Sequence, residues 1–85
     1  MKTEKGWLIE TNINGYAEWL MLDSPMYVRW EWTQDASEAL RFARKIDVEI
    51  MMKKLRTLGV ISFYEDVFPS EHTWYQDKTG EYKQK

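Results

Sequence analysis

Three stretches rich in apolar and strand-forming residues lie in the N-terminal part of the chain, and polar turn residues separate them. Residues 6–11 (GWLIET) form a first run rich in strand-forming residues, and residues 16–22 (YAEWLML) form a second. Between them stands Asn14-Gly15, a pair that favours the positive φ angles of a two-residue hairpin turn. Residues 26–32 (MYVRWEW) alternate most regularly. The pattern therefore predicts a hairpin followed by a third strand.

After residue 34 the period changes to one typical of helices. Asp35 and Glu38 have the spacing of a capping box, in which each side chain accepts a hydrogen bond from the backbone N–H of the other residue. Apolar residues then recur in two helical stripes, first Ala36, Ala39, Leu40 and Ala43, and then Val48, Met51, Met52, Leu55 and Leu58. The two stripes are out of phase with each other. We therefore expect a helix that is bent or broken near residues 44–47 and that stops at Gly59.

The C-terminal third returns to strand-forming residues. Residues 60–67 (VISFYEDV) are β-branched and aromatic, which predicts a fourth strand that ends before Pro69. Residues 73–75 are expected to add a short edge strand, and residues 79–85 to form a frayed tail. The expected fold class is α+β, with a single domain over residues 1–85. In it, a small antiparallel sheet, built in the order β-β-β-α-β, carries the helix on one face.

Alternation along the predicted strands sorts their side chains onto two faces of the sheet. The side chains expected to face the helix are Ile9, Leu20, Leu22, Val28, Trp30, Ile61, Phe63 and Val67. Those expected to face the other way are Leu8, Trp19, Met21, Tyr27, Arg29 and Tyr64. A single helix layer leaves this second face open unless another part of the chain folds over it.

The composition indicates a folded protein with an uneven distribution of charge. Five tryptophans in 85 residues supply large apolar side chains for a small core. The chain has no cysteine, which excludes disulfides and thiolate metal sites and is typical of a reducing compartment, so we expect a cytoplasmic location. Near the N-terminus no apolar run is long enough for a signal peptide or a membrane span. The net charge is −2, but residues 41–59 carry six basic and only two acidic side chains.

Groups suited to catalysis or metal binding are sparse. His72 is the only histidine, and it follows Ser70 and Glu71; positions this close in the sequence are not expected to bring a nucleophile and a base within hydrogen-bonding distance in a geometry useful for catalysis. One histidine, no cysteine and no spaced acidic loop leave neither a zinc nor a calcium pattern. The four isolated glycines form no phosphate-binding loop. We expect no catalytic residue, no metal and no cofactor, and therefore no enzyme.

The open face of the sheet is the first candidate for binding. Trp, Tyr, Met and Arg are the side chains enriched at the centres of protein interfaces. The candidate partner-binding residues are Trp19, Met21, Tyr27, Arg29 and Tyr64. The alternative is that the C-terminal segment, with Trp74 and Tyr75, folds back over this face. The expected partner is another protein or a second copy of this chain.

The basic middle segment is the second candidate. Arg41, Lys45, Lys53 and Arg56 are expected near one face of the helix, where such a stripe can neutralise nucleic-acid phosphates. Against this, the isoelectric point of about 5.4 is low for a dedicated nucleic-acid binder. Glu49 is also spaced to pair with Lys45 and Lys53 on a solvated helix surface. Weak nucleic-acid binding is therefore kept as the alternative function.

One local pattern resembles a known group of proteins. It consists of Trp32-Thr33, Asp35, Ala39, Phe42 and the helix from Lys45 to Leu55. It is similar to small phage and prophage accessory proteins in which a strand ends in Trp-Thr, a short helical turn carries Ala and Phe, and a helix rich in Lys and Glu follows. The sequence departs from this pattern at Arg44, where a Ser or Thr cap is usual.

The resemblance implies a fold and an origin, and it brings no catalytic residues. Together with the candidate surfaces it suggests a non-enzymatic protein-binding module, a small phage or prophage accessory protein of the host cytoplasm. We expect it to modulate a host or viral protein through an exposed face or edge of its sheet. No membrane contact is expected.

Overall fold

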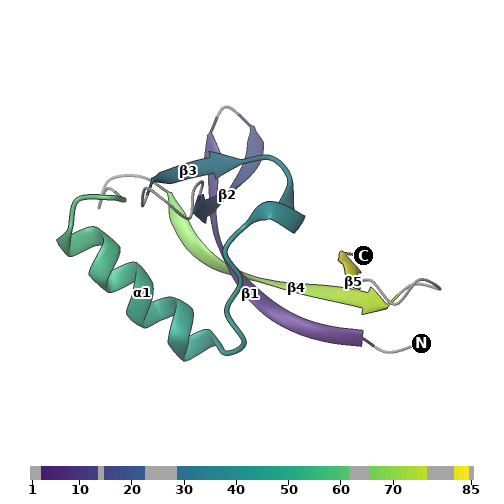
Figure 1. The fold of residues 1–85 in the computed structure, drawn as a ribbon. Helices are drawn as coiled ribbons and strands as arrows, with labels where there is room; N and C mark the ends of the chain where they lie inside the picture. Colours follow the sequence, from purple (N-terminus) through teal and green to yellow (C-terminus); the bar gives the residue numbers. More distant parts are fainter. Residues whose placement is uncertain (1–2, 14, 23–28, 62–65, 77–81, 85) are drawn as a thin grey trace.

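The fold is an antiparallel sheet with a helix on one face (Figure 1). The computed structural model describes residues 3–13, 15–22, 29–61, 66–76 and 82–84. The strands are β1 (Thr3–Ile13), β2 (Tyr16–Leu22), β3 (Trp30–Thr33), β4 (Val67–Gln76) and β5 (Tyr82–Gln84). They lie in the order β3-β2-β1-β4-β5, and each neighbouring pair is antiparallel. The helices are η1, a 3₁₀ turn at Ala36–Glu38, and α1 (Lys45–Thr57). The predicted α+β class is confirmed, and β5 adds a strand to the predicted order.

The predicted hairpin and third strand are present. Ile13 pairs with Tyr16 across the turn, and Gly15 has a φ of +83°, which a glycine adopts without steric cost. β3 pairs with β2 from Trp30 to Thr33, one residue beyond the predicted end. Residues 26–28, the first part of the predicted third strand, lie outside the described residues.

The predicted break in the helix is confirmed, but it lies at residues 39–44, earlier in the chain than predicted, and residues 45–47 belong to α1. After η1 the chain does not return to a helix until Lys45. In this interval Phe42 forms an antiparallel bridge with Trp7: the Trp7 N–H donates to the Phe42 carbonyl (N···O 2.7 Å), and the Phe42 N–H donates to the Trp7 carbonyl (2.9 Å). β2 is paired with β1 only from Glu10 onward, so this part of β1 needs another backbone partner. That tertiary requirement overrides the helical spacing of Ala39 to Ala43.

The predicted capping box is wrong in its pairing. The Asp35 carboxylate accepts from the Ser37 N–H (3.0 Å), while the Glu38 N–H donates to the Asp35 carbonyl (3.0 Å). The Asp35 N–H donates to the Thr33 hydroxyl oxygen (3.0 Å), which leaves it no need of the Glu38 side chain. Hydrogen bonds from the Ser37 hydroxyl and the Ser37 N–H lower the pKa of Asp35. These contacts stabilise a single tight turn. Residues 33–38 therefore serve to connect β3 to the segment before α1.

Both ends of α1 are set by local chemistry. Arg44, in the cap position without a side-chain cap, donates from Nε and Nη2 to the two carboxylate oxygens of Asp47, each at 2.9 Å. This bidentate pair lowers the pKa of Asp47 and raises that of Arg44. At the other end, Gly59 has a φ of +77°, and the Val60 N–H reaches back to the Leu55 carbonyl. The predicted stop at Gly59 is confirmed.

The fourth strand lies further along the chain than predicted. Val60 and Ile61 form a bend, residues 62–65 lie outside the described residues, and β4 begins at Val67 and runs through Pro69. Pro69 is tolerated because β5 pairs only with Trp74 to Gln76, which leaves the outer edge of β4 beside Pro69 without a strand partner in the described residues. The predicted edge strand at 73–75 is part of β4. Within the predicted frayed tail, Tyr82–Gln84 forms β5.

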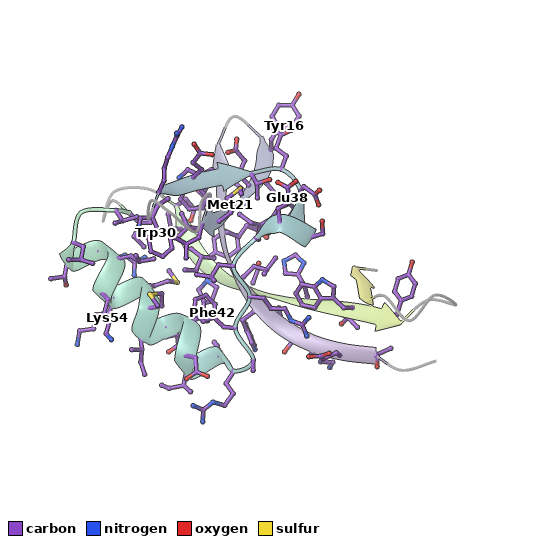
Figure 2. All side chains as sticks on the ribbon, viewed as in Figure 1. Tyr16, Met21, Trp30, Glu38, Phe42 and Lys54 are labelled. Atoms are coloured by element: carbon purple, nitrogen blue, oxygen red, sulfur yellow. The ribbon has the colours of Figure 1, made fainter. Side chains whose placement is uncertain are left out.

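The main core lies between α1 and the sheet. Its buried members are Ile9, Leu20, Val48, Met52, Leu55, Ile61 and Val67. Trp7, Trp30, Trp32, Phe42, Met51 and Val60 pack against them, and Figure 2 shows Trp30 and Phe42 beside α1. The predicted helix-facing positions are confirmed for Ile9, Leu20, Trp30, Ile61 and Val67, whereas Val28 and Phe63 lie outside the described residues. Leu22 is 42% exposed because α1 packs on β1 and β4 and not on the end of β2.

Candidate functional site

The described residues of the predicted partner-binding set lie on or beside β2 and β3. Trp19 and Met21 share the face of β2 opposite α1, and both are half-buried. Arg29 stands just before β3 and is exposed, with its Nη2 2.6 Å from a carboxylate oxygen of Glu31. Tyr27 and Tyr64 lie outside the described residues. The structure therefore brings Trp19 and Met21 onto one surface and leaves Arg29 in an ion pair at its margin.

Trp19 is engaged within the protein. Its indole Nε1–H donates to the Glu10 carboxylate (2.8 Å), and its ring meets the His72 ring edge-on, with centroids 5.6 Å apart. Glu10 lies opposite Trp19 in the β1–β2 register. The charge-assisted hydrogen bond to Glu10 and the ring contact with His72 both stabilise the sheet. Trp19 is half-buried, so only part of its side chain is open to a partner.

Part of the face predicted to be open is covered. Leu8 is 0% exposed and Trp74 is 5% exposed, although neither belongs to the core under α1. Arg41, from the segment between η1 and α1, lies over the Trp74 ring at 4.1 Å from its centroid and forms an ion pair with Glu4. A second packed layer thus covers this face along β1 and β4.

The two residues named for the alternative covering, Trp74 and Tyr75, belong to β4 and so form part of the sheet, while β5, which follows them, contacts η1. Trp74 is a residue of β4 itself and is covered by Arg41. Gly6, next to both, has no room for a side chain, since a Cβ there would lie 2.7 Å from the Arg41 Nε and 2.9 Å from the Trp74 ring. Over Trp74, the cover that the described residues show is Arg41 from the segment before α1.

Ser70 and His72 come within hydrogen-bonding distance, although the sequence predicted no catalytic geometry for them. Both point to the same face of β4 because residues two apart in a strand do so, and the Ser70 hydroxyl lies 2.9 Å from the His72 Nε2. The Glu10 carboxylate lies 3.8 Å from the same nitrogen. A serine-histidine-acid relay places the acid and the nucleophile at opposite ring nitrogens, so these two contacts do not form one. Burial lowers the pKa of His72, and Glu10 partly offsets this.

The most exposed aliphatic side chains of the helical region lie on the side of α1 away from the sheet. Ile46 is 52% exposed, Ile50 is 50% exposed, and Leu58, at the cap that follows α1, is 74% exposed. Leu58 was expected in the core stripe, but the helix ends just before it and only Val48, Met52 and Leu55 of that stripe are buried in α1. Ile46 and Ile50, one turn apart, lie off that stripe, and this spacing is the sequence signal for a second apolar row.

Two lysines and a shallow hollow complete this surface. Lys53, Lys54, Thr57 and Leu58 line a hollow with a volume of about 390 Å³. Figure 2 shows Lys54 pointing away from the sheet. We call the set Ile46, Ile50, Lys53, Lys54, Thr57 and Leu58 the outer face of α1. Ile46 and Ile50 were not predicted as a surface because they lie off the core stripe of Val48, Met52 and Leu55.

The predicted basic stripe is dispersed in the structure. Arg41 precedes α1 and lies over Trp74 on the other side of the sheet. The Arg56 guanidinium turns toward β4 and donates to the Val67 carbonyl (3.3 Å). Lys45 has its Nζ 3.9 Å from Glu49 and 5.6 Å from the centre of the Trp7 ring. The prediction that the four share one helix face is therefore wrong, and of these only Lys53 belongs to the outer face of α1.

Comparison with known proteins adds no assignment. No protein-family model, no curated protein and no solved structure matches this chain. Among the described residues, no group of three or more His, Asp or Glu side chains is placed to hold a metal ion. In the same ranges, α1 and η1 are too short or too polar to cross a membrane. The candidate sites are therefore the outer face of α1 and the exposed parts of the sheet.

Proposed function

We propose that this protein is a non-enzymatic protein-binding module that holds its partner on the outer face of α1. The observation that carries the proposal is the exposure of Ile46, Ile50 and Leu58 on a helix whose inner residues already fill the core. Single exposed apolar side chains are normal on any protein. Aliphatic side chains gathered on one side of one helix, beside a hollow, are more typical of a contact surface.

The size of the surface favours a weak or transient complex. A standard interface buries about 800 Å² on each partner. The outer face of α1 belongs to a helix of 13 residues and presents three large aliphatic side chains, which is less than such an interface requires. A partner bound here exchanges readily, which suits a modulating protein.

The sheet offers an additional place for the same function. In the described residues, β3 has a strand partner on one edge only, and its outer edge is short. On β4, the stretch that β5 does not pair with contains Pro69, which has no N–H to donate. In the same stretch the Val67 carbonyl already accepts a hydrogen bond from Arg56. Strand addition by a partner is therefore better supported at β3 than at β4. The half-buried Trp19 and Met21 lie beside this edge region on β2, so the sheet-face contact also stays a prediction.

The biological setting is part of the proposal. The resemblance to small phage and prophage accessory proteins supports a host or viral protein as the partner. The alternative function, weak nucleic-acid binding, is less well supported, because the predicted basic stripe is dispersed. Only Lys53 and Lys54 remain on the outer face of α1 to contact phosphates.

Site-specific photo-crosslinking in the native host tests the proposal. A photoreactive amino acid replaces Ile50 in one variant and Gln34, which is exposed and lies outside α1, in a matched control. The proposal expects a discrete protein adduct from the position of Ile50 and none from that of Gln34. Equal labelling at both positions, no adduct at Ile50, or an adduct that nuclease removes contradicts it.

A further inference from the structure

We infer that the partner presents an acidic amphipathic segment, with aliphatic side chains and carboxylates on one side, to the outer face of α1. The inference rests on the proposed function and names the chemistry of the partner. It follows from how apolar and charged groups are arranged along α1 and from which of those charges are already paired.

The arrangement is aliphatic at both ends and basic between them. Ile46 and Ile50 occupy the first two turns, and Leu58 stands just after the last turn. Lys53 and Lys54 fall between these aliphatic positions, and side chains three or four apart on a helix are neighbours. Complementary chemistry is therefore apolar, acidic and apolar in order along the partner.

The charges on this surface are available to a partner. Within the described residues, the ammonium groups of Lys53 and Lys54 form no ion pair, and both side chains are exposed. The acidic residues of α1 are engaged elsewhere: Asp47 by Arg44 and Glu49 by Lys45. The outer face of α1 thus carries two positive charges with no carboxylate assigned to them.

The hollow provides the place for an anchor. It is lined by the stems of Lys53 and Lys54 together with Thr57 and Leu58, so an aliphatic side chain inserted there touches apolar atoms while a flanking carboxylate reaches an ammonium group. The Thr57 hydroxyl donates to the Lys53 carbonyl (3.0 Å), so it does not require a partner of its own. One anchor residue with adjacent acidic side chains fits this geometry.

Other occupants match the surface less well. A second copy docked with its own α1 on this face brings the lysines of both copies together around the two-fold axis, and like charges at an interface are unfavourable. A nucleic acid pairs with the lysines but has no counterpart for Ile46, Ile50 and Leu58 along its phosphate backbone. An acidic amphipathic segment satisfies both kinds of side chain.

Peptide binding by fluorescence anisotropy tests the inference with the whole protein. One synthetic helical peptide carries leucines at one-turn spacing with glutamates between them, and a second has glutamine in place of every glutamate. We expect the acidic peptide to bind more tightly, and its advantage to shrink with added salt. The double variant K53Q/K54Q should weaken binding of the acidic peptide about fivefold more than binding of the neutral peptide, as expected for two exposed ion pairs.

The matched control removes the same charge elsewhere. Lys5 and Arg29 are exposed and lie on the sheet, so K5Q/R29Q should leave the affinity of both peptides unchanged. Equal binding of the two peptides, or equal weakening by the two double variants, overturns the inference. So does tighter binding to anionic vesicles or to a DNA duplex than to the acidic peptide, or a dimer in sedimentation that I50Q abolishes. In each case the crosslink at Ile50 still reports separately on the proposed function.

Discussion

The Arg41 guanidinium carbon lies 4.1 Å from the centre of the Trp74 ring, which joins the segment before α1 to the end of β4. The same guanidinium pairs with the Glu4 carboxylate of β1. Two long-range contacts thus hold the segment that connects one side of the sheet to the helix on the other. The placement of α1, and with it of its outer face, depends on this connection.

Replacing Arg41 by alanine should destabilise the fold by about 1–2 kcal/mol, because both the stacking contact and the packing of the side chain over Trp74 are lost. Urea denaturation followed by tryptophan fluorescence measures the change. Arg29→Ala removes an arginine that is 68% exposed and serves as the control, with little expected effect. Equal losses for the two variants would show that the contact with Trp74 adds no stability.

Gly6→Ala should also destabilise the protein, by about 1–3 kcal/mol, because the new methyl group has no space beside Trp74 and Arg41. Since Arg41 provides the closer of the two contacts, Arg41→Ala should relieve part of the strain. A double-mutant cycle between the two substitutions measures this coupling through the free energy of unfolding. Additive effects contradict the geometry.

Trp19→Phe should cost about 1–2 kcal/mol, because it removes the indole N–H that donates to Glu10 and keeps an aromatic ring beside His72. Tyr16 is 66% exposed at the hairpin, and Tyr16→Phe is the matched control with little expected effect. Thermal unfolding of both variants provides the measurement. If Trp19→Phe is as stable as the wild type, Trp19 is freer for a partner than its contacts indicate.

Stability should fall as the pH drops below 6.5, through the titration of His72. Burial holds the pKa of His72 below 6.5 in the folded protein, and Glu10 opposes this only in part. The unfolded chain therefore takes up the proton first, so the stabilisation is complete above pH 6.5 and is lost as the pH falls through the lower, folded-state pKa. Trp19, Ser70 and Trp74 lie against the ring, and the Glu10 carboxylate lies 3.8 Å from its Nε2.

The free energy of unfolding, followed through this pH range for the wild type and His72→Gln, measures the effect. The slope should be smaller in the variant. Asp35 and Asp47 also have lowered pKa values, but they titrate below 3.8 and do not contribute in the same range. An identical slope in the two proteins rules out His72 as its source.

Substitutions on the two sides of α1 should separate stability from binding. Met52 is buried in the core, so Met52→Ala should cost about 2–4 kcal/mol. Ile46→Gln and Ile50→Gln change exposed positions and should each alter the free energy of unfolding by about 0.5 kcal/mol or less. Chemical denaturation of the three variants checks this contrast. A large loss with Ile50→Gln would place Ile50 in the core.

Local signals predicted the parts of the fold that depend on neighbours in sequence. The hairpin at Gly15 and the helix stop at Gly59 follow from φ angles that glycine adopts easily, and both are present. The alternation of apolar and polar residues around Trp30 and Trp32 predicted β3, because successive side chains of a strand point to opposite faces of the sheet. These features need no information from distant parts of the chain.

The parts that failed depend on long-range pairing. Phe42 leaves its helical pattern because the backbone of Trp7 requires a partner, and no local rule shows that β2 parts from β1 at that point. Pro69 predicted the end of a strand, yet it lies within β4, in a stretch that pairs with β1 but not with β5. Leu58 matched the core stripe by spacing but falls just after the last residue of α1. The aliphatic row of Ile46 and Ile50 was not predicted because it lies off the core stripe, and only the packed structure shows that it is exposed.

The most direct test of the binding surface is a titration of the ¹⁵N-labelled protein with the acidic amphipathic peptide, followed by amide chemical-shift changes. We expect saturable changes that cluster at Ile46, Ile50, Lys53, Lys54, Thr57 and Leu58. Changes that cluster instead on Met21 and Glu31 of the sheet, or no saturable change at all, would contradict this expectation.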